Sequence, residues 1–156
     1  MSLKASIEIA APPSAVRAKF LDFTSLPSYT RAFESITSPK PGTELVKGDK
    51  VSVKLANSPA FSGVIETNTP THFSWTGSLP FIFTGTHSFY FSPSDTTPNG
   101  TTFTQEEFFS GVLGYALMGD NVVGRAVGMK EKTQKGWIRF NEDLKRVLEG
   151  EVGGKQ

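Results

Sequence analysis

Hydrophobic and polar residues alternate along several short segments of this chain. In residues 49–55, for example, Val51, Val53 and Leu55 share one side of the alternation. Successive side chains of a strand point to opposite faces of a sheet, so a period of two predicts strands. The pattern predicts strands at residues 6–9, 49–55, 71–76, 83–91 and 101–111, and a less regular one at 61–67. Turn residues separate the later segments, which is typical of an antiparallel meander.

Two segments near the N-terminus favour helices instead. A double proline ends the first predicted strand, and Val16 and Phe20 then follow at helical spacing, which predicts a helix near residues 13–22. Residues 26–29 indicate a short second helix or a turn that reaches Phe33. The fold is therefore expected to have two short helices after its first strand.

The C-terminal part predicts a long helix from about residue 124 to residue 149. Its apolar residues recur every three or four positions opposite a charged face; they are Trp137, Phe140, Leu144 and Val147 or Leu148. Gly150 is expected to end this helix, because glycine is common just past a helix C-terminus. Residues 151–156 are then predicted to form a disordered tail.

The order of these elements predicts one α+β domain over residues 1–150. A strand, two short helices, a strand meander and a long helix follow one another, which favours a single antiparallel sheet packed on the C-terminal helix. A length of 156 residues is that of one domain. No internal repeat or change of composition indicates a second domain.

Composition and charge exclude several functional classes. The 16 basic and 15 acidic residues are spread along the chain without a basic run, so no nucleic-acid partner is expected. The absence of cysteine excludes thiol catalysis, and with only two histidines we expect no metal site and no cofactor. The N-terminus lacks the apolar core of a signal peptide, and no segment reaches the ~20 apolar residues of a membrane span. A soluble, cytoplasmic protein without stable membrane insertion is therefore expected.

One histidine interrupts a row of phenylalanines in residues 83–91. One side of the alternation there carries Phe83, Gly85, His87, Phe89 and Phe91. The phenylalanine row should face the core, so the same is expected of His87. The preceding hairpin is expected to place Trp75 over Gly85. The same register places Phe73 beside His87.

The last predicted strand, residues 101–111, adds polar residues to the same inner face. Phe103 favours the odd positions of this strand as the inner ones, which places Gln105 and Glu107 beside it. This strand should pair with residues 83–91, and the alternative registers bring His87 opposite Glu107 or Gln105. A polar cluster within an aromatic wall is therefore expected.

Two interpretations of this cluster remain open. In one, His87 is a buried core residue that Glu107 satisfies by a hydrogen bond, with no further role. In the other, the cluster lines a pocket and orients or protonates a ligand. Small residues in the C-terminal helix would leave space for such a pocket, and residues 111–128 have the composition of a lid. Close helix packing and a plain loop are the alternatives for these two segments.

Further sequence features indicate a family. Each is a weak signal alone, but together they follow one another in order along nearly the whole chain. They are Ile7 and Ile9, Ala11-Pro12, Val16, Asp22-Phe23, Tyr29, Gly48, Phe73-Ser74-Trp75, Gly85-Thr86-His87-Ser88-Phe89, residues 101–111, and Asn141 with Leu144-Lys145. In these the chain resembles the START-like SRPBCC superfamily, which includes polyketide cyclases and dehydratases, lipid-transfer START domains and birch-pollen-allergen-type proteins. The resemblance implies a helix-grip fold, in which a curved antiparallel sheet of six or seven strands wraps around the C-terminal helix and encloses a hydrophobic cavity.

Two departures weaken particular assignments within this superfamily. The chain is shorter than full lipid-transfer START domains, which argues against a sterol or phospholipid ligand. It also lacks an obvious inward arginine of the kind that many aromatase/cyclases use. Its arginines are expected on helices or loops; they are Arg17, Arg31, Arg125, Arg139 and Arg146.

The leading hypothesis, which the resemblance implies, is that an internal cavity binds a small hydrophobic or aromatic molecule. The protein would then be a carrier or sensor of a lipid-like or secondary-metabolite ligand. The expected ligand-binding residues are Phe73, Trp75, Phe89, Phe103, Gln105 and Phe109, with Tyr29, Tyr115 and Leu117 at the mouth. An alternative is an enzyme of the polyketide cyclase/dehydratase type, with His87 as general acid or base and Glu107 as its partner. A third hypothesis is a regulatory or stress-related interaction module.

Overall fold

A computed structural model describes residues 2–79, 83–111, 122 and 128–153 of the chain. The elements in chain order are β1 (Ser2–Ile9), α1 (Pro13–Leu21), η1 (Phe23–Ser25), α2 (Leu26–Tyr29), β2 (Phe33–Thr37), η2 (Gly42–Glu44), β3 (Lys50–Leu55), β4 (Phe61–Asn68), β5 (His72–Leu79), β6 (Phe83–Pro93), β7 (Thr101–Ser110) and α5 (Met129–Gly153).

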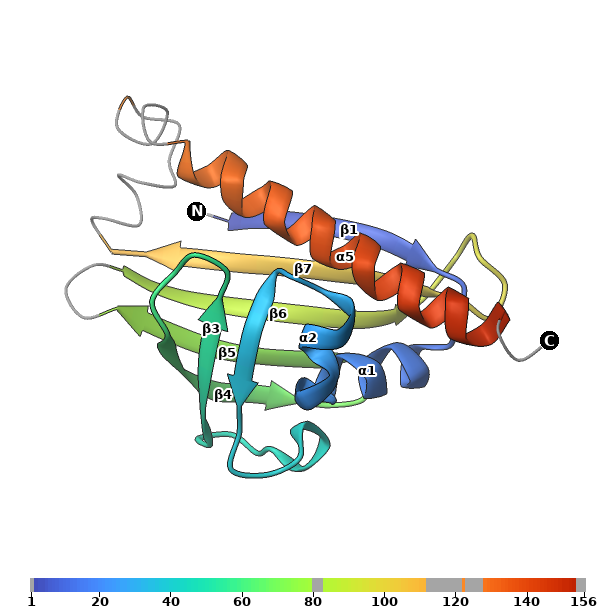
Figure 1. The fold of residues 1–156 in the computed structure, drawn as a ribbon, viewed down its shortest axis with the longest axis horizontal. Helices are drawn as coiled ribbons and strands as arrows, with labels where there is room; N and C mark the ends of the chain where they lie inside the picture. The colour runs from blue at the N-terminus through green and yellow to red at the C-terminus, as the bar shows by residue number, and fades with distance from the viewer. Residues whose placement is uncertain (1, 80–82, 112–121, 123–127, 154–156) are drawn as a thin grey trace.

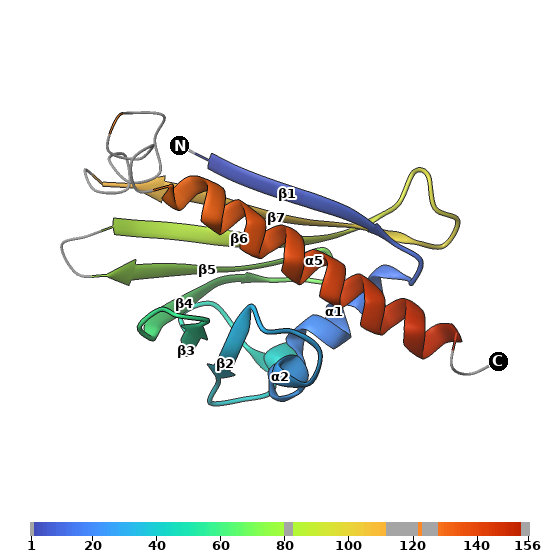
Figure 2. The same ribbon diagram turned by 45° about the horizontal axis from the view of Figure 1, so that its top comes forward.

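The strands form one seven-stranded sheet in the order β1-β7-β6-β5-β4-β3-β2. Every neighbouring pair is antiparallel. The sheet curves around α5, which runs along its inner face, while α1 and α2 lie near the C-terminal half of α5 (Figures 1 and 2). The predicted α+β architecture, a curved sheet wrapped around a long C-terminal helix, is confirmed.

Several elements differ from the predictions; the first strand, for example, begins at Ser2 instead of residue 6. The strand β2 was not predicted, because a bulge between Phe33 and Ser35 interrupts its alternation and only Phe33 and Ile36 are buried. The helix α5 continues to Gly153, past the predicted end at Gly150. A glycine inside a helix costs only about 1 kcal/mol relative to alanine, so it does not by itself end one. The predicted helix start near residue 124 and residues 154–156 lie outside the described residues.

Phe20 of α1 occupies the centre of the hydrophobic core. Its side chain is fully buried, and its ring centroid lies 4.4 Å from that of Phe89 and 5.8 Å from that of Phe73. Phe140 of α5 approaches it from the other side, at 6.0 Å. Phe103 of β7 completes this group at 6.3 Å. Phe20 therefore joins the short helix, the sheet and α5 in one aromatic cluster.

Side chains of α5 cover the free edge of β1. Lys145 Nζ donates to the backbone oxygen of Glu8 (2.8 Å), and Gln134 Nε2 donates to that of Lys4 (3.3 Å). The backbone N–H of Ala10 donates to the carboxylate of Glu149 (3.1 Å). An edge strand with unpaired backbone groups invites pairing with another chain, so these contacts protect the edge.

Candidate functional site

The strand register brings His87 and Glu107 opposite each other. In the β6–β7 pair, His87 faces Glu107 and Phe91 faces Phe103. Of the two residues expected opposite His87, the structure therefore has Glu107 there and not Gln105. Within β7, Phe103 and Gln105 are buried on the inner face, whereas Phe108 is exposed.

The register predicted for the preceding hairpin is wrong by two residues. His87 faces Trp75, and Phe89 faces Phe73. The reason is that β5 continues to Leu79, which pairs with Phe83. The midpoint between the two paired strands therefore lies one residue later in the sequence than expected. Each residue of β5 consequently pairs with a residue of β6 two positions later than predicted.

Aromatic rings surround His87 on three sides. Its ring stacks on that of Phe89 with centroids 4.2 Å apart. The rings of Trp137 and Trp75 lie at centroid distances of 4.8 Å and 5.9 Å. The chain has only two tryptophans, so both of them contact this histidine.

Gln105 determines which nitrogen of His87 carries the proton. Gln105 Nε2 donates to Asn141 Oδ1 (2.7 Å) and lies 3.4 Å from the backbone oxygen of Trp137. A backbone oxygen can only accept a hydrogen bond, so the amide nitrogen of Gln105 must be on this side. Gln105 Oε1 therefore faces His87 Nε2, at 3.0 Å. His87 must donate through Nε2–H, which leaves Nδ1 with its lone pair. The residue that holds the tautomer is thus Gln105, whereas Glu107 was expected to be the hydrogen-bond partner of His87.

The carboxyl group of Glu107 lies on the other side of the ring. Its Oε2 is 3.7 Å from His87 Nδ1, too far for a direct hydrogen bond. Its side chain is only 16% exposed, and it forms no hydrogen bond with any residue that the structure describes. A carboxyl group that is largely removed from water normally has hydrogen-bond partners, so this one is unusual.

A row of glycines makes room for this carboxyl group. Gly63, Gly77 and Gly85 lie opposite one another on adjacent strands of the inner face. A β-carbon on Gly85 would lie 2.5 Å from Oε1 of Glu107, and one on Gly77 would lie 2.9 Å from the ring of Phe61. Both distances are too short for non-bonded atoms. Glycine at positions 85 and 77 therefore leaves the space that the side chains of Glu107 and Phe61 occupy.

Burial shifts the pKa values of both groups toward their neutral forms. Loss of hydration raises the pKa of Glu107 to about 7. It lowers the pKa of His87 to about 3, against a smaller opposing effect of the hydrogen bond with Gln105. Between these values the site holds a neutral imidazole and a protonated carboxyl group. Glu107 is therefore the group that ionises near neutral pH.

The predicted aromatic wall divides into two parts. Phe73, Phe89 and Phe103 are fully buried, and Phe20 and Phe140 pack against them. These three rings belong to the filled core. Trp75 packs against Phe73 and Phe89 in the same core, and its ring also lies beside His87. Phe109 belongs to a second cluster with Leu3, Ala5 and Trp137. Tyr29 packs against Phe140 in another part of the molecule. The predicted mouth residues Tyr115 and Leu117 lie outside the described residues.

Two residues of α5 complete the site and were not among the predicted site residues. Trp137 covers the ring of His87, and Asn141 anchors Gln105. They lie four residues apart, on the face of α5 that packs against the sheet. A polar residue on this face, Asn141, was the signal in the sequence that could have revealed them.

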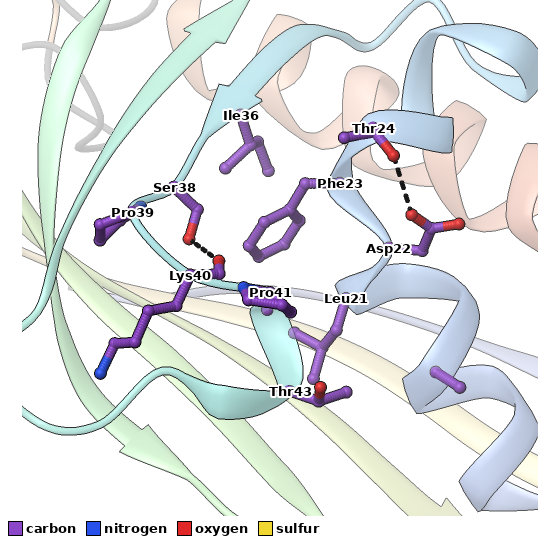
Figure 3. Close-up of a pocket in the computed structure, with 12 residues that line it drawn as sticks. Leu21, Asp22, Phe23, Thr24, Ile36, Ser38, Pro39, Lys40, Pro41 and Thr43 are labelled. Atoms are coloured by element: carbon purple, nitrogen blue, oxygen red, sulfur yellow. Dashed lines mark hydrogen bonds between the residues drawn. The ribbon is translucent and has the colours of Figure 1, made fainter.

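Two pockets that described residues line lie away from His87 and Glu107. One, of about 580 Å³, is bounded by η1 and by the connection from β2 to η2. Figure 3 shows Phe23, Ile36, Pro39 and Pro41 around it, with Asp22 at its rim accepting a hydrogen bond from Thr24. The other, of about 410 Å³, lies between α2 and α5.

Two further findings concern the described residues alone. None of their helices is long and apolar enough to cross a membrane. No group of three or more histidine, aspartate or glutamate side chains among them is placed to hold a metal ion.

Solved structures share this fold at low sequence identity. A hypothetical protein from Helicobacter pylori has a TM-score of 0.74 at 13% identity, with 95% of this chain and 88% of that chain covered. The di-domain ARO/CYC BexL of the BE-7585A biosynthetic pathway has a TM-score of 0.70 at 13% identity, with 96% and 50% covered. Ara h 8.0201 has a TM-score of 0.65 at 14% identity, with 96% and 98% covered. These likenesses establish the helix-grip fold.

The family follows from the sequence. A comparison with curated proteins returned no match. A profile of the family described as polyketide cyclase / dehydrase and lipid transport matches residues 1–149 of the 156. The chain therefore belongs to the polyketide cyclase / dehydrase and lipid transport family.

Proposed function

We propose that this protein binds a small hydrophobic or aromatic molecule that carries a hydroxyl or carbonyl group. The observation that carries the proposal is the Glu107 carboxyl group, which is largely but not fully buried, faces His87 Nδ1 at 3.7 Å and forms no hydrogen bond with any described residue. We call the surroundings of these two groups the Glu107 site; its residues are Trp75, Gly85, His87, Glu107, Phe109 and Trp137.

The chemistry of the Glu107 site suits a ligand hydroxyl. His87 Nδ1 offers a lone pair, because the Nε2 proton is committed to Gln105. The protonated carboxyl group of Glu107 offers a donor. A ligand hydroxyl between them would donate to Nδ1 and accept from Glu107, while a carbonyl would accept from Glu107 alone. Aromatic side chains around a few polar groups are typical of small-molecule sites.

The family supports this proposal in general terms. Its description combines polyketide cyclases, dehydrases and lipid transport, activities that share small, largely apolar substrates or ligands. Since one fold can host carriers and enzymes alike, the ligand must be argued from the site itself. Here the site combines tryptophan rings with one acid and one base.

The two tryptophans make the proposal testable by NMR, because both contact His87. We expect 2-naphthol to shift both indole N–H signals and to bind about tenfold more tightly than naphthalene, the difference made by hydrogen bonds to buried groups. In Glu107→Leu the advantage of 2-naphthol should disappear. The control is Glu106→Leu, because Glu106 faces away from the inner side of the sheet.

Failure of both probes to shift the indole signals at millimolar concentration would refute binding at this site. Equal preference for 2-naphthol in wild type and Glu107→Leu would refute the role of Glu107. Native mass spectrometry of protein purified from its own source then identifies the natural ligand.

Proton transfer is a second candidate function, favoured by the pKa of about 7 for Glu107. A general acid works best when its pKa is near the working pH. In this version Glu107, and not His87, donates the proton to the hydroxyl of a β-hydroxy ketone, which departs as water. His87 Nδ1 accepts the α-proton, and the electron pair of that C–H bond forms the carbon–carbon double bond. We expect any dehydration of 4-hydroxy-4-phenylbutan-2-one, followed by absorbance of the conjugated enone, to slow as pH rises through 7. Glu107→Gln should abolish it. If the protein binds this ketone but does not dehydrate it, the result supports the carrier function and not the enzyme.

A further inference from the structure

The pocket between α2 and α5 is lined by three arginines. Arg31 comes from the connection between α2 and β2, and Arg139 and Arg146 come from α5. Ser28, Thr30 and Asp143 contribute further polar groups to its wall. None of the residues of the Glu107 site lines this pocket, so a ligand bound here would be independent of the proposed function.

The one acidic group in this wall already has partners. Asp143 is buried, at 9% exposure, and its Oδ2 accepts a hydrogen bond from Thr30 Oγ1 (2.9 Å). Its other oxygen pairs with the guanidinium group of Arg146. Asp143 therefore orients Arg146 and neutralises one positive charge of the pocket.

Among the described residues, the other two arginines have no such partner. Arg139 lies four residues before Asp143 on the same helix, a favourable spacing for an ion pair, yet the pair forms with Arg146 instead. Arg139 and Arg31 are both exposed. Neither forms a hydrogen bond or an ion pair with any residue in the described ranges. The pocket thus contains three arginines and one aspartate, a net charge of +2.

The arginines approach the pocket from two elements. Arg139 and Arg146 are seven residues apart, which is two helical turns, or about 10 Å along the axis of α5. They therefore share one face of the helix, and Arg31 lies on a separate segment. A guanidinium group presents several N–H donors in a plane and matches the oxygens of phosphate or carboxylate groups.

We propose that this pocket binds the phosphate group of a phosphate monoester. The charge of such a group, about −1.5 to −2 at pH 7, balances the +2 of the lining. The volume of about 410 Å³ is within the range of small-molecule sites and exceeds what a bare ion needs. Pro27 and Tyr29 supply apolar wall for the organic part of the ligand.

A phosphate monoester occurs both in free metabolites and in the headgroup of phosphatidic acid. Ile138, next to Arg139, is 46% exposed and would meet a lipid surface if the headgroup were the source. The experiment therefore has a soluble arm and a vesicle arm. The first uses phenyl phosphate, with benzoate and phenol as comparisons. The second uses phosphatidylcholine vesicles that contain phosphatidic acid, compared with vesicles that contain phosphatidylglycerol at equal charge.

Amide chemical-shift titrations test the soluble arm. Phenyl phosphate should shift signals of residues 28–31 and of the α5 residues near Arg139, and should bind at least tenfold more tightly than benzoate. Arg139→Gln and Arg31→Gln should each weaken binding about tenfold. Arg139→Lys should lose part of the affinity, because lysine keeps the charge but not the planar donors. Lys50→Gln, which removes one exposed charge on β3, is the matched control.

The outcomes separate cleanly. Tight binding of phenyl phosphate assigns the site to a soluble monoester, and binding only to phosphatidic acid vesicles with the same dependence on Arg139 assigns it to a lipid headgroup. If Lys50→Gln and Arg139→Gln lose affinity for phenyl phosphate equally, binding depends only on the overall charge of the protein. That result would overturn the proposal. Absence of binding in both arms would also overturn it.

Discussion

Replacing Glu107 with glutamine is expected to stabilise the protein at pH 8, by about 3 kcal/mol in the free energy of unfolding. The folded state raises the pKa of Glu107 from 4.5 to about 7 because burial removes the carboxyl group from water. At pH 8 the wild-type protein must therefore hold an unfavourable buried charge. Glutamine removes that charge while it keeps the shape of the side chain.

The stabilisation depends on pH in a defined direction. The folded state holds its proton on Glu107 more tightly than the unfolded chain does, so wild-type stability falls as pH rises from 4.5 to about 7. The advantage of Glu107→Gln should thus be full above pH 7, shrink as pH falls, and vanish below 4.5.

His87 has the opposite effect over an overlapping range. Its pKa falls from 6.5 to about 3 on folding, so the unfolded chain takes up a proton first and stability falls as pH drops from 6.5 towards 3. In the wild type the two slopes oppose each other between 4.5 and 6.5. In Glu107→Gln the slope of His87 should appear without this opposition, together with a contribution of the same sign from His72, whose pKa burial also lowers.

Urea unfolding of both proteins at pH 8, 6 and about 4 measures these differences. Glu106→Gln is the control, since Glu106 is the next residue but lies on the other face of the sheet. A loss of stability in Glu107→Gln at pH 8 would contradict the expectation. It would mean that the ionised carboxylate is itself stabilised in the folded protein.

Replacing Phe20 with alanine is expected to lower the free energy of unfolding by about 3–5 kcal/mol. The side chain is fully buried, and its ring lies within 6.3 Å of the ring centroids of Phe73, Phe89, Phe91, Phe103 and Phe140. Rings fixed on the sheet and on α5 cannot collapse fully into the space that Phe20 leaves, so a cavity remains. Since domains are stable by only about 5–15 kcal/mol, this loss is large.

Phe108→Ala provides the matched control for this experiment. It deletes the same ring from β7, but Phe108 is 56% exposed, so the expected change is within about 0.5 kcal/mol. Urea unfolding of both variants gives the comparison. Similar losses in the two proteins would show that the cluster around Phe20 is not the centre of the core.

The sequence predicts the faces of the strands well, because an alternation of period two leaves little freedom. The inner positions of β6 and β7, including His87 and Glu107, follow from that alternation. Register is harder to predict. Extending β5 to Leu79 moved the partner of His87 by two residues, and no pattern within the strands marks where a connection is centred. The strand β2 was not predicted because a bulge interrupts its alternation of buried and exposed residues.

The chemistry of the site depends on contacts that sequence patterns do not specify. That Gln105 and not Glu107 holds the ring of His87 follows from the position of Asn141 on α5. The close packing around Phe89 and Phe103 follows from the position of Phe20 of α1, whose ring contacts both. Helical spacing predicts that Phe20 is buried, but not which rings it meets.

The contacts between α5 and β1 also bear on the order in which the protein folds. Ser2 pairs with Phe108, and Lys145 holds the backbone of Glu8, so the first strand waits for partners more than a hundred residues away. Such distant contacts slow folding, because a long loop must close before they form. During synthesis, β1 can therefore pair only after β7 has been made, and its edge can be covered only after α5 has left the ribosome.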